Sequence, residues 1–236
     1  MKDILKLENV TSGYGDLTIL YDIDLKVSKE ERVGILGANG AGKTTLINTI
    51  LGIADIKKGR VFLDGEDVTN LPPYSRALKG IGVVPEGKRL FPKMTVFENL
   101  KVAASVTKEA KLNFEKNLDV VFSIFPRLKE RLNQKSATLS GGEQQMLAVA
   151  RVLMRQPKII ILDEPSQGLA PVLVDELYKA LENMVNMEVT FIIAEQHVAK
   201  VLNFVNRVLV LEMGRIVFEG PSVEIKDKLI GAYVYK

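Results

Sequence analysis

Eight consecutive residues have the spacing of a phosphate-binding loop. Their sequence fits the pattern GxxxxGK[ST] at every defined position. The run reads Gly37, Ala38, Asn39, Gly40, Ala41, Gly42, Lys43, Thr44. Glycines let backbone N–H groups converge on phosphate oxygens, and a helix beginning here adds the partial positive charge of its N-terminus. We expect Lys43 to reach the β- and γ-phosphates of a nucleotide, Thr44 to ligate Mg²⁺, and Thr45 to lie against the phosphates.

Two adjacent carboxylates follow an apolar segment. Ile159–Leu162 is entirely aliphatic and is followed by Asp163 and Glu164. A carboxylate at the end of a strand suits Mg²⁺, directly or through water, so Asp163 is a candidate metal ligand. Glu164, one residue later, is placed to polarise an attacking water as general base. An ordinary acidic turn at a strand end is the alternative.

A second glycine-containing segment runs from Leu139 to Gln145 with the sequence LSGGEQQ. Ser140 and Glu143 have the spacing of a capping box at the start of a helix. That explanation leaves out Gly141 and Gly142, since each costs about 1 kcal/mol in a helix relative to alanine. Glycines here uncover N–H groups so that an anion can approach. The first loop already holds one nucleotide, so the expected ligand is the nucleotide of a second chain.

Hydrophobic periodicity predicts the strands and helices that position these motifs. Strands are expected over residues 5–10, 20–27, 32–36, 60–65, 81–84, 159–162 and 189–194, with a hairpin of 207–212 and 215–219 turning at Met213-Gly214. Helices are expected over residues 44–51, 96–105, 108–125, 141–154 and 172–187. Strands thus surround a helical stretch, which indicates an α/β core with a helical insert.

Composition narrows the classes of protein that remain. The chain has 236 residues, enough to bury a full core, and is 47% hydrophobic and 26% charged. Its net charge of +3, with 32 basic and 29 acidic residues and no basic arm, does not indicate nucleic-acid binding. It has no cysteine, which excludes disulfides and thiolate chemistry. No apolar run reaches the roughly 18 residues of a membrane span. We expect a soluble cytoplasmic chain that reaches a membrane only by docking.

With these motifs in this order, the chain from Tyr14 to Gly220 resembles the nucleotide-binding subunits of ABC transporters. That resemblance implies a P-loop NTPase core of mostly parallel sheet flanked by helices, with an N-terminal antiparallel β subdomain and a helical insert. It makes residues 1–236 a single domain. Within it, residues 1–87 and 157–236 form the nucleotide-binding core, and residues 88–156 form the helical subdomain with the signature segment.

The resemblance also implies an assembly and its ligands. In this family, LSGGQ-type signatures close over the ATP of a partner subunit, so two subunits pack head to tail around two ATP molecules with Mg²⁺. Ser140, Gly141 and Gly142 would face the partner's phosphate loop. Tyr14 stands where the family places an aromatic ring that stacks on adenine; a core or edge-strand tyrosine is the alternative.

Three positions depart from the family pattern. Glu86 stands in place of a glutamine that senses Mg²⁺ and the attacking water, and as a carboxylate it would face Mg²⁺ or water. Gln196 stands in place of a histidine that contacts the γ-phosphate, although a shift of one residue would give that role to His197, the only histidine. Ala170 stands in place of an aspartate at the dimer interface. The sensing chemistry therefore stays open.

The departures point to a subgroup. Residues 84–92, 164–171 and 195–196 look like the shorter of the two ATPases in branched-chain amino acid importers, and urea and amide importers look similar. The implied partners are a second ATPase subunit (itself or a sister chain), membrane permease subunits and, indirectly, a solute-binding protein. The implied location is the cytoplasmic face of the cell membrane, with docking through a groove near residues 86–92 and the helical insert.

Two other classes of protein were weighed. A soluble ABC ATPase acting on DNA or ribosomes usually carries a coiled-coil insertion or a second ATPase copy, and this sequence has neither. A P-loop kinase needs an acceptor site and a lid, and the LSGGEQQ segment argues against it.

Overall fold

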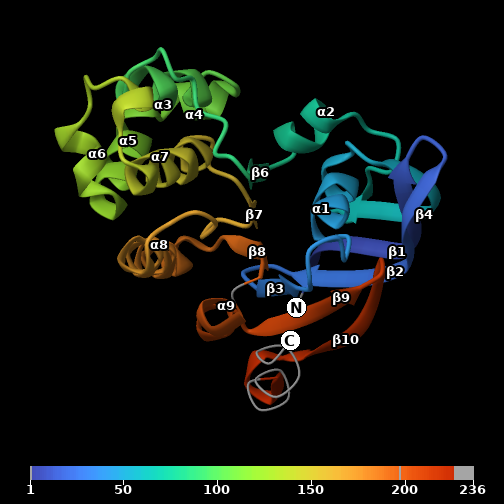
Figure 1. Cartoon of the computed structure of the whole chain (residues 1–236). Coiled ribbons are helices and arrows are strands. Elements are labelled where there is room, and N and C mark those ends of the chain that lie inside the picture. Colours follow the sequence, from blue (N-terminus) through green and yellow to red (C-terminus); the bar gives the residue numbers. More distant parts are fainter. Residues whose placement is uncertain (1, 197, 226–236) are drawn as a thin grey trace. The chain divides into compact units, whose positions relative to one another are not determined.

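The computed structural model describes residues 2–196 and 198–225 (Figure 1). The chain divides into two compact units. The first unit comprises Met1–Lys79 and Thr190–Lys236, and the second comprises Gly80–Val189. Each unit is described by itself. The subdivision expected from the sequence, with a helical subdomain at residues 88–156, stays a prediction.

The first unit contains an antiparallel sheet in the order β2-β1-β4-β5. Its strands are β1 (Asp3–Tyr14), β2 (Leu17–Ser28), β4 (Asp55–Leu63) and β5 (Glu66–Asp67). The first two strands extend beyond their predicted ranges because they pair along their full length, from Asp3 opposite Ser28 to Tyr14 opposite Leu17. Helix α1 (Lys43–Leu51) packs against β1, β2 and β4. This packing fixes the helix that follows the phosphate loop.

The first unit also contains strands in the order β10-β9-β3-β8. They are β3 (Arg32–Leu36), β8 (Thr190–Glu195), β9 (Arg207–Glu212) and β10 (Arg215–Pro221). β3 is parallel to both β8 and β9, and β9 turns into β10 as the predicted hairpin. Every residue of β8 is buried, as expected for a parallel strand covered on both faces. Helix α9 (Val198–Phe204) contacts β3 and β8.

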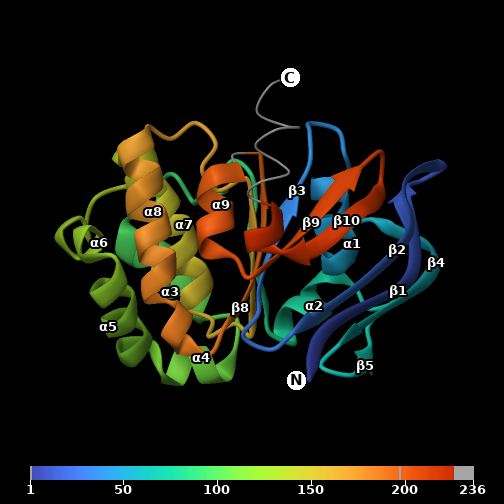
Figure 2. The same cartoon turned by 90° about the horizontal axis from the view of Figure 1, so that it is seen from below.

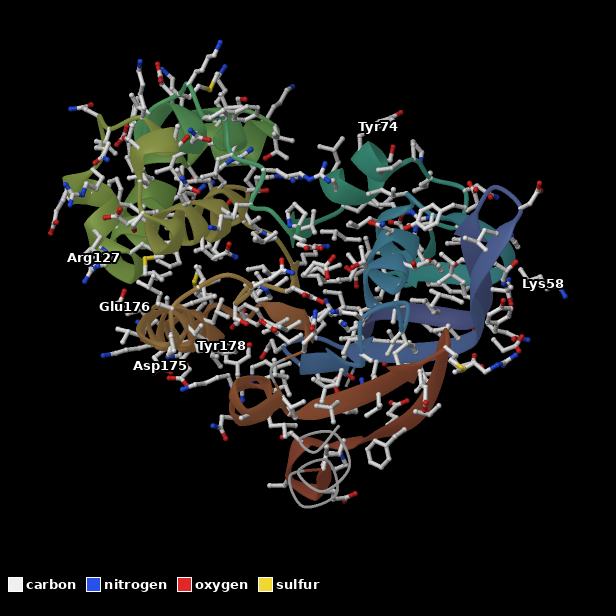
Figure 3. The ribbon with its side chains drawn as sticks, in the orientation of Figure 1. Lys58, Tyr74, Arg127, Asp175, Glu176 and Tyr178 are labelled. Carbon is white, nitrogen blue, oxygen red and sulfur yellow. The ribbon has the colours of Figure 1, made fainter. Side chains whose placement is uncertain are left out.

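In the second unit, parallel strands β6 (Ile81–Val84) and β7 (Ile159–Asp163) accompany a group of helices. Figure 2 labels these helices, α3 to α8. The helices are α3 (Val96–Ala104), α4 (Lys108–Leu112), α5 (Phe114–Ile124), α6 (Pro126–Glu130), α7 (Gly141–Leu153) and α8 (Pro171–Asn183). α7 is the centre of this group, since it contacts α3, α5, α6 and α8. On α8, Tyr178 is buried, whereas Glu176 pairs with Arg127 of α6 at 3.5 Å (Figure 3).

Both predicted capping boxes are present, with Thr95 and Glu98 at the start of α3 and Ser140 and Glu143 at the start of α7. The single helix predicted over residues 108–125 is wrong. The chain leaves helical geometry at Asn113 (φ −94°, ψ 20°), which ends α4 and begins α5. Asparagine is a poor helix-interior residue because its side chain competes for backbone hydrogen bonds.

Some elements were missed or misjudged in extent. α2 (Pro73–Leu78), α6 and α9 were missed; α2 and α6 are shorter than the window over which periodicity can be read. The helix predicted to reach Met187 ends at Asn183 and continues as a 3₁₀ turn, Val185–Met187. No helix among residues 2–196 and 198–225 is long and apolar enough to cross a membrane.

Candidate functional site: a nucleotide-binding site

The phosphate loop lies between β3 and α1 in the first unit, as its sequence predicts. Ala38, Asn39 and Gly40 are exposed at its tip. Gly40 has a positive φ of 79°, and a side chain added there would meet nothing within 4 Å, so its backbone faces open space. This is the geometry that lets a bulky anion approach main-chain N–H groups.

Helix α1 begins without a side-chain cap, and its N-cap residue is Gly42 in the left-handed region (φ 108°). Helices α3 and α7, by contrast, satisfy their first turns with capping boxes. The first N–H groups of a helix need partners, and an anion supplies them where no side chain does. The start of α1 therefore fits a phosphate group.

Lys43 is 5% exposed, and its side chain folds back along the loop. Its Nζ donates to the carbonyl oxygens of Gly37 at 2.9 Å and Ala38 at 3.3 Å. These bonds hold the ammonium group at the loop. The Thr44 side chain, next along the chain, is exposed, whereas Thr45 is buried.

Two further predicted site residues of the first unit, Tyr14 and Gln196, lie at the ends of strands. Tyr14 ends β1 with 38% of its surface exposed, and its hydroxyl accepts a hydrogen bond from Asn48 Nδ2 on α1 at 2.6 Å. Gln196 follows β8 and is exposed, while the preceding Glu195 is buried. His197 lies outside the described residues.

In the second unit, the two predicted carboxylates stand at the end of β7. Asp163 is its last residue and is 4% exposed. Glu164 is half-buried and has a left-handed backbone with φ 48°. Such a conformation is uncommon and costly for a residue other than glycine, and strain of this kind concentrates at functional sites. The two adjacent carboxylates thus differ in burial.

The signature segment begins α7 in the same unit. Ser140 Oγ accepts from the Glu143 amide at 3.2 Å, and Glu143 Oε2 accepts from the Ser140 amide at 2.9 Å. The hydrogen bond from the Ser140 backbone outweighs partial burial and lowers the pKa of Glu143, and Arg131 adds to this at 3.4 Å. A hydroxyl that accepts in this way keeps its own hydrogen to donate. Ser140 can therefore cap α7 and bind an anion at once.

The two signature glycines have different surroundings. Gly141 is exposed, and a side chain there would meet only Lys88 Nζ at 3.7 Å. Gly142 is buried, and an added Cβ would lie 2.8 Å from Leu173 Cδ2 of α8. A side chain at Gly142 would thus require the Leu173 side chain to shift. That Gly141 and Gly142 both present N–H groups to a ligand stays a prediction.

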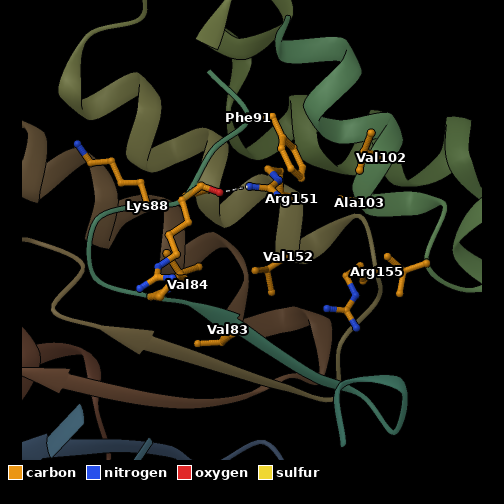
Figure 4. Close-up of a pocket in the computed structure, with 13 residues that line it drawn as sticks. Val83, Val84, Lys88, Phe91, Val102, Ala103, Arg151, Val152 and Arg155 are labelled. Carbon is orange, nitrogen blue, oxygen red and sulfur yellow. Dashed lines mark hydrogen bonds between the residues drawn. The ribbon is translucent and has the colours of Figure 1, made fainter. Parts of the chain in front are cut away.

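Two of the positions that depart from the family pattern, Glu86 and Ala170, also lie in the second unit. Glu86 is exposed in the loop after β6, and Ala170 is the exposed N-cap of α8. After Glu86 come three successive residues with positive φ: Gly87 at 78°, Lys88 at 63° and Arg89 at 45°. This loop leads into a cavity of about 350 Å³ (Figure 4).

The cavity joins the loop after β6 to helices α3 and α7. Apolar side chains line it together with basic ones, and no acidic residue of the described chain does so. Arg151 stacks over the Phe91 ring at 4.7 Å and donates to the Arg89 carbonyl at 2.8 Å. Its Nε is buried without a hydrogen-bond partner among the described residues. Burial lowers the pKa of Arg151 and of the nearby Arg155.

The structure thus places Tyr14, the phosphate loop and Gln196 in the first unit, and Glu86, the signature, Asp163 and Glu164 in the second. The family described as ABC transporter matches residues 20–167, more than half of the chain. The chain belongs to the ABC transporter family.

Individual relatives cover nearly all of this ABC transporter chain. It is 40% identical to the high-affinity branched-chain amino acid transport ATP-binding protein BraG of Pseudomonas aeruginosa, over 98% of this chain and 99% of that protein. It is 36% identical to a probable branched-chain amino acid transport ATP-binding protein, LivF, of Archaeoglobus fulgidus, over 95% and 94% of the two chains.

Solved structures of ATP-binding cassettes have the same fold. The ADP conformation of a cassette of an ABC transporter superposes with a TM-score of 0.85 at 30% identity, covering all of both chains. A dimeric cassette in a post-hydrolysis state, bound to ADP and Pi, superposes with a TM-score of 0.80 at 25% identity, over 92% of this chain and 98% of that one. The predicted P-loop NTPase fold is confirmed. The chain is an ATP-binding subunit of an ABC transporter and an ATPase.

Sequence reasoning missed two groups of residues around this site. Arg151 and Arg155 were overlooked in the cavity beside the loop after β6, although two arginines four residues apart near the end of an apolar helix were a readable signal. Asn48 was also overlooked, since nothing in the sequence relates it to Tyr14 before the structure brings their side chains together.

Proposed function

We propose that this ABC transporter subunit hydrolyses ATP in a head-to-tail dimer and so drives import of branched-chain amino acids. The observation that carries the dimer is that two helix starts of the described chain expose backbone beside glycines: the start of α1, where no side chain caps the helix, and Ser140–Gly141 at α7, where the Ser140 hydroxyl still has a hydrogen to donate. One ATP engages the first. The second then serves the ATP of the partner, as the likeness to a dimeric cassette supports.

Within each site, the base and phosphates of ATP meet different side chains. The exposed ring of Tyr14 stacks on adenine. Lys43 exchanges its bonds to the Gly37 and Ala38 carbonyls for bonds to the β- and γ-phosphates. The open backbone around Gly40 binds the remaining phosphate oxygens.

Glu164 acts as general base toward the attacking water, and its left-handed backbone sets the direction of its carboxylate. The Thr44 hydroxyl and the Asp163 carboxylate are oxygen donors of the kind Mg²⁺ prefers, and few protein ligands are needed when phosphates supply the rest. Accordingly, the described residues hold no cluster of three or more His, Asp or Glu ligands. Mg²⁺ bound there would neutralise charge developing on the phosphates.

Glu86 and Gln196, which stand in place of the family's usual sensing residues, act at the same site. Glu86 lies toward Mg²⁺ or the attacking water, and Gln196 donates a hydrogen bond to the γ-phosphate without adding charge. His197, one residue later, is the alternative γ-phosphate contact. Replacing either one by alanine identifies it, since only the true contact costs much kcat.

Release of the γ-phosphate opens the dimer. Hydrogen bonds to charged groups contribute about 1.5–3 kcal/mol each. Losing two or three of them costs about 3–9 kcal/mol, or roughly 10²–10⁶ in dimer affinity. That range is wide enough for hydrolysis to reverse association.

The cavity beside the loop after β6 receives a permease segment. Its lining combines an apolar floor, including Val83 and Val152, with the cationic side chains of Lys88, Arg151 and Arg155. A short amphipathic segment that carries apolar residues and a carboxylate complements this surface. The Nε of Arg151, which has no hydrogen-bond partner among the described residues, supplies a donor for that carboxylate.

The relatives at 40% and 36% identity support branched-chain amino acids as the solute. The full system then includes permease subunits, a solute-binding protein and a second ATPase subunit, which is this chain or a sister chain. The subunit works at the cytoplasmic face of the membrane through its permease. Urea or amides are the alternative solutes, and reconstitution with the permease and binding protein, followed by leucine uptake, tests the choice.

The dimer is tested by Ser140→Arg in the isolated subunit. ATP affinity of the monomer should stay within about twofold of wild type, while ATP turnover falls to background, because only the partner's ATP meets Ser140. Ser123→Arg on α5, an exposed serine of the same unit, is the matched control and should keep its turnover. Loss of ATP affinity in the Ser140→Arg monomer would contradict the cross-chain arrangement. Glu164→Gln, in contrast, should bind ATP and form a longer-lived dimer.

The docking cavity is tested by Val102→Asp, which puts a negative charge on its rim at a side chain that is 37% exposed. Association with the permease should weaken while ATP turnover of the isolated subunit is kept. Leu112→Asp, at a residue 86% exposed outside the cavity, is the control. Equal permease binding by both variants would rule the cavity out.

A further inference from the structure

Two side-chain hydrogen bonds join the end of β1 to helix α1 in the first unit. Ser12 Oγ lies 2.6 Å from Thr49 Oγ1, and both residues are completely buried. Two residues later on the strand, the Tyr14 hydroxyl accepts from Asn48 Nδ2 at 2.6 Å. The first bond lies in the core, whereas the second lies at the surface, on a ring that is 38% exposed. Their consequences for ligand binding therefore differ.

The backbone around Tyr14 is held tightly. A Cβ added at Gly13 would lie 1.9 Å from the Leu17 carbonyl oxygen, so β1 and β2 approach each other closely at this hairpin. The Gly15 amide donates to Asp55 Oδ2 at 2.9 Å, which ties the turn to β4. With the backbone fixed at one end of the side chain, the hydroxyl bond to Asn48 fixes the other. The hydroxyl end of the side chain is then held in one place, which restricts χ1 of Tyr14.

We propose that Asn48 is a positioning residue that holds the Tyr14 side chain at the place where the nucleotide base stacks, and so contributes to selection of nucleoside triphosphates. This rests on the proposed stacking role of Tyr14. A ring restrained before binding gives up less conformational entropy when the base stacks on it. Asn48 itself touches the tyrosine and acts on the base only through it.

The same helix also sets the spacing between base and phosphates. Its N-cap, Gly42, belongs to the phosphate loop, and Asn48 lies six residues further along. At 1.5 Å per residue this is about 9 Å of helix. Because one rigid element carries both contacts, the phosphate loop and the stacking ring keep a fixed separation. A ligand with phosphates but no base uses only the first contact.

Comparing a ligand that has a base with one that has only phosphates therefore tests the role of Asn48. Affinities of the isolated subunit for ATP and for inorganic tripolyphosphate are measured with Mg²⁺ by titration calorimetry. Asn48→Ala should weaken ATP about fivefold, the equivalent of one hydrogen bond, and leave tripolyphosphate unchanged. Tyr14→Phe should do the same, and the double variant should be no worse than either alone. KM for ATP should rise while kcat is kept.

Two further variants separate positioning from a merely structural role. Asn48→Asp should retain ATP affinity, since the tyrosine hydroxyl can donate to a carboxylate. Ser12→Ala removes the buried bond between the same two elements, and should lower the Tm while leaving the ratio of ATP to tripolyphosphate affinity unchanged.

The proposal is overturned if Asn48→Ala leaves ATP affinity unchanged, or weakens tripolyphosphate as much as ATP. Tyr14→Ala distinguishes the stacking role of Tyr14 from the positioning role of Asn48. If it leaves ATP affinity unchanged, the stacking role of Tyr14 fails and this inference fails with it. If Tyr14→Ala weakens ATP and Asn48→Ala does not, the stacking role stands and only the inference about Asn48 is wrong.

Discussion

Replacing Arg76 by methionine tests how the C-terminal end of α1 is held. Arg76 lies on α2 and is 1% exposed, although it is charged. Its guanidinium donates to four backbone carbonyls at 2.8–3.1 Å; these belong to Thr49, Ile50, Thr69 and Leu71. Two of the acceptors are in the last turn of α1, where carbonyls lack partners within the helix. Burial lowers the pKa of Arg76, but a guanidinium stays charged at neutral pH.

The expected loss follows from the acceptors that methionine would leave behind. The Thr49 carbonyl keeps a second donor, the Gly52 amide at 3.2 Å. The other three carbonyls have no other donor among the described interactions. At the low end of the penalty for an unsatisfied buried group, about 1 kcal/mol each, Arg76→Met should cost about 3 kcal/mol. For a chain of this size that corresponds to a fall in Tm of about 6–12 °C.

Thermal unfolding followed by circular dichroism at 222 nm measures the loss. Arg60→Met, in the same unit, is the matched control, because Arg60 is 61% exposed and pairs with Glu8 at 3.3 Å; its cost should be below about 1 kcal/mol. Arg76→Lys should fall between the two, since one ammonium cannot reach all four carbonyls. Equal melting temperatures for Arg76→Met and Arg60→Met would refute the argument.

Two other predictions concern stability. Burial raises the pKa of Glu31, but hydrogen bonds from Arg207 and from the Ser28 amide outweigh it, so the folded pKa lies below 4.5. The ionised Glu31 therefore stabilises the fold above pH 4.5, and this stabilisation is lost as the pH falls through the folded pKa. Arg207→Met removes the partner of Glu31, so the variant should show a smaller decline of Tm between pH 5 and pH 3 than the wild type. An unchanged decline would contradict the pairing of Glu31 with Arg207. In Gly142→Ala, overlap with Leu173 should cost about 1–3 kcal/mol, and the gain in helix propensity of about 1 kcal/mol leaves a net cost of about 0–2 kcal/mol. Leu173→Ala in the same chain should recover part of the overlap cost, and strictly additive changes of Tm would contradict the contact.

The sequence predicted best those features whose causes are local. The phosphate loop needs glycines at set positions, and each capping box needs two residues three apart, so both could be read directly. The strand β7 was likewise apparent as an aliphatic run ending in two acids. In each case the physical reason lies within a few residues of chain.

Features that depend on distant partners could not be read in this way. Nothing in the sequence shows that the Cα of Gly142 packs against Leu173, thirty-one residues later. Arg76 lies in a segment for which no element was predicted, and its role becomes apparent only when α2 places it at the end of α1. The break at Asn113 was missed because apolar periodicity continues across it, while the backbone does not.

Helix α1 brings these observations together, because three parts of one nine-residue helix serve separate purposes. Its start holds phosphate through Lys43 and the uncapped N–H groups, Asn48 in its second turn fixes the ring of Tyr14, and its last carbonyls bind Arg76. If these purposes are physically distinct, the corresponding variants should change different quantities: tripolyphosphate affinity, ATP affinity alone, and Tm alone. Contacts that share no partner are expected to add, so Asn48→Ala and Arg76→Lys combined should show both single effects unchanged. A combined loss of ATP affinity well beyond that of Asn48→Ala would mean that the end of α1 and its nucleotide contacts are coupled.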